Sequence, residues 1–289
     1  MKPVSSPYLV PFDGTLQLDD LSTQPPDGAS GKKECRRQLK ETMKHLDALQ
    51  RVLYADDRFA LLLVFQAMDA AGKDGTIRAI LSGLNPAGCQ VFSFKSPSKE
   101  ELDHDFLWRT AVRLPERGRI GVFNRSYYEE VLVVRVHPEY LGGQRLPQIP
   151  PLEELWSQRY ESIRDWEKHL VRNGTVILKF WLNVSPEEQK KRFLKRIDEP
   201  DSNWKFNDGD LEARARWDQY MQAYEAMLNA TSTSGAPWYA IPADNKAYMR
   251  MTVADIVRRR LEGMGLSYPR LSDSEQAQLP VHRAALLAE

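Results

Sequence analysis

The sequence has few cysteines, no excess of charge of either sign and no long apolar run. Cys35 and Cys89 are its only cysteines in 289 residues, which excludes a disulfide framework and a zinc-binding cysteine spacing. Forty Lys and Arg balance forty Asp and Glu, which argues against a general nucleic-acid footprint. No apolar run approaches the roughly 20 residues of a membrane helix, and residues 1–6 lack a signal-peptide core. We therefore expect a cytoplasmic protein without membrane or nucleic-acid partners.

The remaining pattern predicts one α/β domain. Residues 1–31 are rich in Pro, Gly, Ser and Asp and should form a flexible arm, residues 32–265 the domain, and residues 266–289 a peripheral tail. Alternating strands and helices imply a three-layer fold, a mostly parallel five-stranded sheet with helices on both faces. The predicted strands are 61–65, 89–94, 119–124, 175–182 and 237–242. The predicted helices are 32–53, 76–81, 100–113, 152–172, 185–196, 211–228 and 252–261.

The loop after the first predicted strand has the features of a phosphate site. A buried strand leads into small residues with a lysine and then into a helix, so that backbone N–H groups, the helix N-terminus and the ammonium converge on an anion. Against the pattern G-x-x-x-x-G-K-[ST], Gly72 and Lys73 match, whereas Ala67 and Asp74 depart. An ordinary strand–helix turn with an exposed Lys73 is the alternative. The predicted phosphate-binding residues are Ala70, Ala71, Gly72, Lys73, Asp74, Gly75 and Thr76.

Acidic, amide and guanidinium groups near this loop are the candidate catalytic residues. Asp69 would repel phosphates unless a metal intervened, so we interpret it as a magnesium ligand or as a group acting on the reacting phosphate. Asn124 ends the third predicted strand and can order a metal-bound water, and Arg125 offers a planar fork for a phosphate. Glu129, one helical turn further, can supply a carboxylate. The alternative is a helix N-terminus whose acids suit the macrodipole.

Two further segments can contribute cations. Lys95 follows the second predicted strand at the edge where ligands of parallel sheets gather, and Arg109 in the next helix can reach a ligand there. The predicted helix 185–196 is crowded with Lys and Arg and leads into a breaker-rich segment. We predict a lid over about residues 188–212 that closes on phosphates, with a solvated charged face as the alternative.

Several stretches together resemble one family. They are Asp69-Ala70-Ala71-Gly72-Lys73-Asp74-Gly75, Phe123-Asn124-Arg125-Ser126-Tyr127-Tyr128-Glu129-Glu130-Val131-Leu132-Val133, Trp204-Lys205-Phe206 and Ala236-Pro237-Trp238. In this order they are similar to the type 2 polyphosphate kinases, polyphosphate:nucleotide phosphotransferases, over roughly residues 32–261. The resemblance implies a P-loop kinase fold of the thymidylate-kinase type with a helical lid, magnesium dependence, and homodimers or homotetramers.

The resemblance also implies roles for individual residues. Asp69 corresponds to the essential loop aspartate and Lys73 to the loop lysine, while Asn124 with Glu129 resembles the subclass that accepts nucleoside mono- and diphosphates. The implied reaction is reversible transfer of the terminal phosphate of inorganic polyphosphate to AMP and ADP, giving ATP, with GMP and GDP as further candidate acceptors. Asp69 would hold Mg²⁺, or Mn²⁺ in its place, with Asn124 or Glu129 acting through water. The implied lid ligands of polyphosphate are Arg192, Arg196 and Lys205. The predicted nucleotide-binding residues are Lys95, Arg109, Arg125, Tyr128, Glu129 and Arg135.

Two functions of other classes compete with this one. An ATP-dependent nucleoside monophosphate kinase of the thymidylate type should carry the full phosphate-loop pattern, so Ala67 and Asp74 count against it. A non-catalytic nucleotide sensor should have lost its acids, yet Asp69, Glu129 and Glu130 are present. We therefore predict an active phosphotransferase.

Overall fold

A five-stranded parallel sheet forms the centre of the domain. The computed structural model describes residues 1–206 and 208–289, and the side chain of Lys205 lies outside this description. Every strand pair is parallel, in the order β2–β3–β1–β4–β5, which confirms the predicted sheet. The strands are β1 (Ala60–Gln66), β2 (Cys89–Ser93), β3 (Ile120–Asn124), β4 (Thr175–Asn183) and β5 (Trp238–Pro242).

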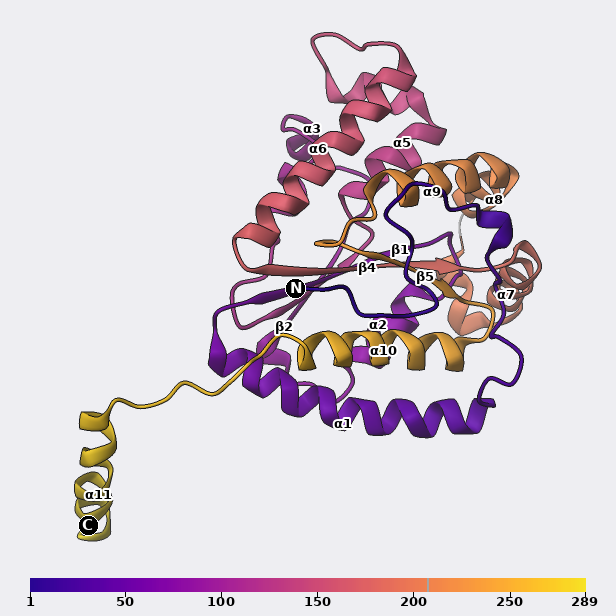
Figure 1. Ribbon diagram of the computed structural model, residues 1–289. Coiled ribbons are helices and arrows are strands. Elements are labelled where there is room, and N and C mark those ends of the chain that lie inside the picture. The colour runs from indigo at the N-terminus through magenta and orange to yellow at the C-terminus, as the bar shows by residue number, and fades with distance from the viewer. Residues whose placement is uncertain (207) are drawn as a thin grey trace.

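Helices cover both faces of this sheet (Figure 1). Helices α1, α2 and α10 pack together on one face, and α6 and α9 pack together on the other, so the predicted three-layer fold is confirmed. The helices are α1 (Lys32–Asp56), α2 (Lys73–Leu81), α3 (Lys99–Leu102), α4 (Trp108–Ala111), α5 (Val133–Val136), α6 (Leu152–Arg172), α7 (Pro186–Asp198), α8 (Asp208–Ala215), α9 (Trp217–Thr231), α10 (Lys246–Glu262) and α11 (Asp273–Leu287).

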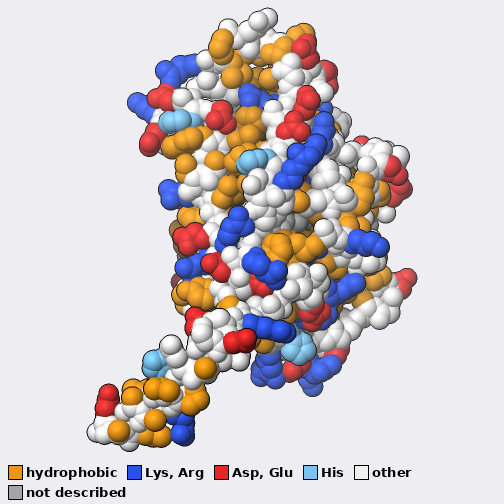
Figure 2. All heavy atoms as spheres, turned by 60° about the vertical axis from the view of Figure 1, so that its left-hand side comes forward, with side chains coloured by type: hydrophobic (Ala, Val, Ile, Leu, Met, Phe, Trp, Pro, Cys, Tyr) orange, Lys and Arg blue, Asp and Glu red, His pale blue; other side chains and the backbone are white. Residues whose placement is uncertain are grey.

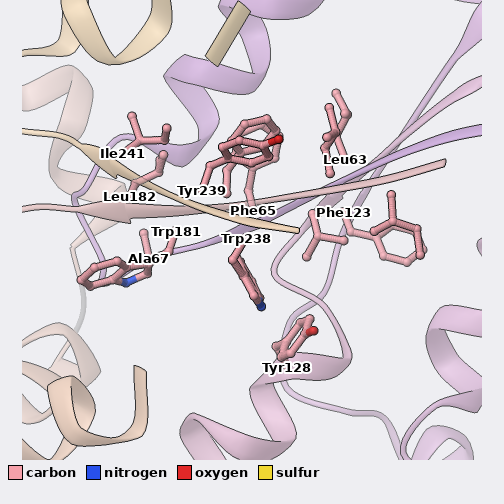
Figure 3. Packing of buried hydrophobic residues seen from close by; sticks show 14 of the residues in the cluster. Leu63, Phe65, Ala67, Phe123, Tyr128, Trp181, Leu182, Trp238, Tyr239 and Ile241 are labelled. Atoms are coloured by element: carbon pink, nitrogen blue, oxygen red, sulfur yellow. The ribbon is translucent and has the colours of Figure 1, made fainter. Parts of the chain in front are cut away.

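Strand β1 lies in the middle of the sheet, and its largely apolar sequence suits this buried position. All seven residues of β1 are buried, as expected of a strand covered by helices on both faces. Its Phe65 stacks on Phe180 of β4 with ring centroids 5.1 Å apart, within the aromatic packing drawn in Figure 3. This packing fixes the carboxyl end of β1, and with it the point where the phosphate loop leaves the sheet.

Two predicted helices are broken by local capping and backbone geometry. The segment predicted as helix 100–113 forms α3 and α4, because the Asp105 carboxylate accepts the Leu107 N–H and so competes with helical bonding. The segment predicted as helix 211–228 forms α8 and α9, which meet at Arg216, a residue outside the helical region with φ −102° and ψ 26°. Each of these two predicted helices is therefore a pair of shorter helices in the structure.

The two terminal segments differ in their packing. The N-terminal segment, expected to be a flexible arm, lies along β5: Val10 N–H donates to Trp238 O at 3.0 Å and the Val10 side chain is buried. Helix α11 at the other end stands away from the domain, with its apolar side chains open to solvent (Figure 2). Among the described residues, none of the helices has the length and apolar character needed to span a bilayer.

Candidate active site

The loop between β1 and α2 folds around its own lysine. Lys73 is 9% exposed, and its Nζ donates to Ala67 O at 2.7 Å. The tight turn places Gly72 at φ 109° and Ala70 at φ 62°, a region that residues with a β-carbon rarely adopt. Burial, and then the charge of Arg125, lower the pKa of Lys73 to about 8. An anion bound beside this ammonium group would favour its charged form.

A second cation lies between two carboxylates at the same edge. Arg125 Nη2 donates to Asp69 Oδ1 at 2.6 Å, and its Nη1 donates to Glu129 Oε2 at 3.0 Å. The register of β1 and β3 explains this meeting, because Phe65 pairs with Asn124 and the residues after both strands emerge side by side. The predicted convergence of Asp69, Arg125 and Glu129 is thus present in the structure.

These groups determine one another's ionisation. Burial alone would raise the pKa of Asp69, but the charges of Lys73 and Arg125 together hold it below its ordinary value. The Glu129 carboxylate has the largest effect on Arg125 and raises the pKa of that guanidinium. Asp69 is therefore ionised and Arg125 charged at neutral pH, so the site holds both a carboxylate and a guanidinium in their charged forms.

The amide of Asn124 lies beside this charge group and has other partners. Its Nδ2 donates to Asp74 Oδ1 at 2.6 Å and to Ser93 Oγ at 3.3 Å. In the described part of the chain, no three His, Cys, Asp or Glu side chains cluster as metal ligands. Asp69 uses Oδ1 for Arg125, and no described residue donates to its Oδ2. One such carboxylate oxygen next to a phosphate site fits Mg²⁺, which commonly takes one or two carboxylates together with substrate phosphates.

A cavity of about 830 Å³ opens next to Arg125. Its lining includes the predicted ligands Lys95, Arg109 and Glu129, and its volume lies in the range of small-molecule sites. Arg109 is oriented by a 2.7 Å hydrogen bond from its Nη2 to Lys95 O. No sequence pattern indicates Gln144, which also lines the cavity and donates from its Nε2 to the Glu130 carboxylate at 2.9 Å.

Three predicted ligands point elsewhere. Tyr128 is fully buried and its hydroxyl bonds Glu167, so it is not open to a nucleotide. Arg135 donates to Tyr160 Oη at 2.7 Å and is not among the cavity-lining residues. Thr76 is also buried, and its hydroxyl donates to Gly72 O within the loop. In the structure each of these three side chains is bonded to a local or internal partner, and their ligand roles stay predictions.

The predicted lid cations Arg192 and Arg196 have partners within the protein. Arg192 on α7 is 6% exposed and donates to four backbone carbonyls and to Glu188, so it supports the phosphate loop instead of facing solvent. Its carbonyl partners are Ala70, Ala71, Ala243 and Asp244. Arg196 remains partly exposed, 3.9 Å from Asp210, and the side chain of Lys205 lies outside the described residues.

A group of cations that the sequence did not reveal lies behind the loop. Gly75 and Arg78 are three residues apart on α2, and Lys246 and Arg250 are four apart on α10, so each pair shares a helix face. A β-carbon on Gly75 would lie 2.5 Å from Arg250 Nη2. Burial, and then the charges of Arg78 and other neighbouring arginines including Arg36, lower the pKa of Arg250. No ion pair joins Arg36, Arg78, Lys246 or Arg250 to another described residue; we call these four the basic group.

Comparisons with known proteins agree on one family. The family model described as "Polyphosphate kinase 2" matches residues 29–267. A protein of Rhodopseudomonas palustris named "ADP-polyphosphate phosphotransferase" is 55% identical over 86% of each chain. The "AMP/ADP-polyphosphate phosphotransferase" of Meiothermus ruber is 43% identical over 91% of this chain and 94% of its own. A crystal structure of "Polyphosphate Kinase 2" from Arthrobacter aurescens superposes with a TM-score of 0.86 at 34% identity and full coverage of both chains.

The pKa of Lys73 leads to a testable pH dependence. A bound anion raises the pKa of this ammonium group, so anion binding takes up a proton above about pH 8 and affinity falls as pH rises further. Below pH 8 the affinity for tripolyphosphate should be nearly constant, and above it the affinity should fall by at most about tenfold per pH unit. Calorimetric titration at constant ionic strength measures this, and Lys73→Met should bind weakly with no such fall. A wild-type affinity that stays flat to pH 9.5 would contradict the assignment.

Proposed function

The chain belongs to the polyphosphate kinase 2 family, and from this membership we propose that it transfers the terminal phosphate of inorganic polyphosphate to AMP and to ADP. The observation that carries the proposal is the meeting of Lys73, Asp69 and Arg125 beside a nucleotide-sized cavity. The names of the relatives support polyphosphate as donor, and one of them includes both AMP and ADP. They do not favour an ATP-dependent nucleoside monophosphate kinase.

The geometry supports a division of the site between donor and acceptor. The phosphate loop with Lys73 would bind the reacting end of polyphosphate. The cavity on the other side of Arg125 would hold the nucleotide, with Lys95 and Arg109 near its phosphates. Arg125 is positioned to leave one of its carboxylates and bind the acceptor phosphate with the same planar fork. Catalysis would then consist mainly of positioning two polyanions and neutralising their charge.

We propose Mg²⁺, or Mn²⁺ in its place, as the cofactor, held by Asp69 and through water by Glu129 or Asn124. When bound, the ion would neutralise charge on the reacting phosphates. Asp69 is suited to hold a cation because its pKa is kept low by Lys73 and Arg125 despite burial, which would otherwise raise it. Arg125 keeps that carboxylate oriented toward the junction through its 2.6 Å bond.

Several further features are proposed on the resemblance and the site together. The segment around α7 and α8 would act as a lid that excludes water, so that polyphosphate is transferred and not hydrolysed. The protein would work in the cytoplasm as a homodimer or homotetramer, consistent with two free cysteines and with AMP, ADP and ATP as ligands. The basic group would hold donor phosphates that lie beyond the reacting end.

Nucleotide production without ATP tests the proposed function. Purified protein, long-chain polyphosphate and Mg²⁺ are offered AMP or ADP, and products are separated by anion-exchange chromatography. We expect ATP from ADP, and ADP followed by ATP from AMP. Product from ADP alone would contradict the AMP activity. Transfer from ATP with none from polyphosphate would place the protein with the ordinary nucleotide kinases.

Chain length tests the role of the basic group. Replacing both Arg78 and Arg250 by Gln removes two guanidinium groups that form no ion pair with a described residue, and it should raise KM for long-chain polyphosphate by about tenfold. KM for tripolyphosphate should change by less than about twofold, because a short donor reaches only the loop. The matched control is Arg258→Gln, on the same helix α10 but paired with Asp255 and Glu262. Equal effects on long and short donors would show that the group acts on the loop itself.

A further inference from the structure

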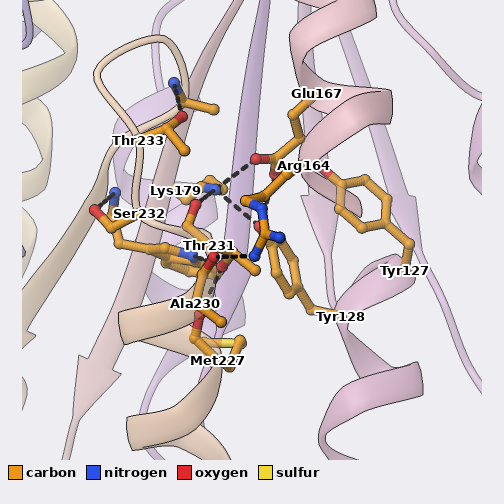
Figure 4. A network of polar contacts seen from close by, with 12 residues as sticks. Tyr127, Tyr128, Arg164, Glu167, Lys179, Met227, Ala230, Thr231, Ser232 and Thr233 are labelled. Atoms are coloured by element: carbon orange, nitrogen blue, oxygen red, sulfur yellow. Dashed lines mark hydrogen bonds and ion pairs between the residues drawn. The ribbon is translucent and has the colours of Figure 1, made fainter. Parts of the chain in front are cut away.

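Two adjacent tyrosines join the acceptor side of the site to the protein interior. Tyr127 and Tyr128 begin the 3₁₀ helix η3 (Tyr127–Val131), directly after Arg125 and Ser126. Both rings are almost completely buried, and both hydroxyls donate to Glu167 Oε1 on α6, at 2.9 Å from Tyr127 and 2.7 Å from Tyr128. Figure 4 shows Glu167 of α6 together with Tyr127 and Tyr128 of η3 and Lys179 of β4.

A buried lysine closes the network. Lys179 of β4 has no exposed surface, and its Nζ uses all three donor positions. They bind Glu167 Oε2 at 2.7 Å, Tyr128 Oη at 2.8 Å and Thr231 O on α9 at 2.8 Å. The network therefore has its charges paired and its hydroxyls bonded, the condition under which buried polar groups confer rigidity.

The segment held by this network is the wall of the cavity. Arg125, Ser126, Tyr127, Glu129 and Glu130 all line the cavity, so one short stretch of chain presents the acceptor-side groups. Arg125 has φ 63°, a conformation that persists for a residue with a β-carbon only where its surroundings determine it. The tyrosine hydroxyls hold the chain next to Arg125 in place through their hydrogen bonds to Glu167.

We propose that Tyr127 and Tyr128, anchored by Glu167 and Lys179, are positioning residues that fix Arg125 and Glu129 for the acceptor nucleotide. The proposal rests on the proposed function and extends it to two side chains whose hydroxyls are bonded inside the protein. The donor loop has a separate support, because Arg192 binds the carbonyls of Ala70 and Ala71. Loss of the tyrosine anchors should therefore affect the acceptor and spare the donor.

The double variant Tyr127→Phe with Tyr128→Phe isolates this role. It removes both hydroxyls but leaves Lys179 paired with Glu167 and the Tyr128 ring position packed against Trp238. The matched control is Tyr239→Phe, which loses a buried phenol hydroxyl bonded to Val4 O, remote from η3 in the chain and outside the network. Wild type and variants are compared by KM for AMP and for polyphosphate, by tripolyphosphate binding and by Tm.

We expect the double variant to raise KM for AMP about tenfold or more while KM for polyphosphate and the tripolyphosphate Kd stay within about twofold. Its Tm should resemble that of Tyr239→Phe. If the double variant does not fold, Tyr128→Phe alone should shift KM for AMP in the same direction. An unchanged KM for AMP, or parallel rises for both substrates, would overturn the proposal. A wild-type protein that makes no nucleotide would instead refute the proposed function.

Discussion

The site depends on the balance of charge around Arg125 at the carboxyl edge of the sheet. This guanidinium lies between Asp69 and Glu129, and the Lys73 ammonium is buried beside them. Cations held this way carry a cost of burial that bound phosphates can offset. Under the proposed function the same arrangement would explain why an acid stands inside this loop, because Asp69 binds Arg125 through one oxygen and would keep the other for a metal ion.

Two separate supports hold the halves of this site. Arg192 from α7 binds the carbonyls of the phosphate loop, and the network of Glu167 and Lys179 binds the tyrosines after β3. Each support contains a long basic side chain, Arg192 or Lys179, that is buried and held by several hydrogen bonds. Helix α7 of the proposed lid thus contacts the proposed donor loop through Arg192, and this contact would couple the lid to the conformation of the loop.

Much of the fold and the centre of the site could be predicted from the sequence. The apolar run 61–65, the small-residue loop and the helix after it have local signatures, and parallel strands bring Asp69 and Arg125 to one edge. The features that could not be predicted involve partners distant in sequence. Tyr128 resembles a ligand in the sequence because its partners Glu167 and Lys179 lie on other elements, and no local pattern shows that Arg192 binds backbone carbonyls. The basic group exists only because α1, α2 and α10 pack together.

The most direct test of the charge balance is the turnover of Asp69→Asn with polyphosphate and ADP. The substitution keeps the shape of the side chain and removes its charge. Our account predicts a loss of kcat of about a hundredfold or more, with Tm close to that of wild type and tripolyphosphate binding as tight or tighter. A folded variant whose kcat stays within about threefold of wild type would contradict the account.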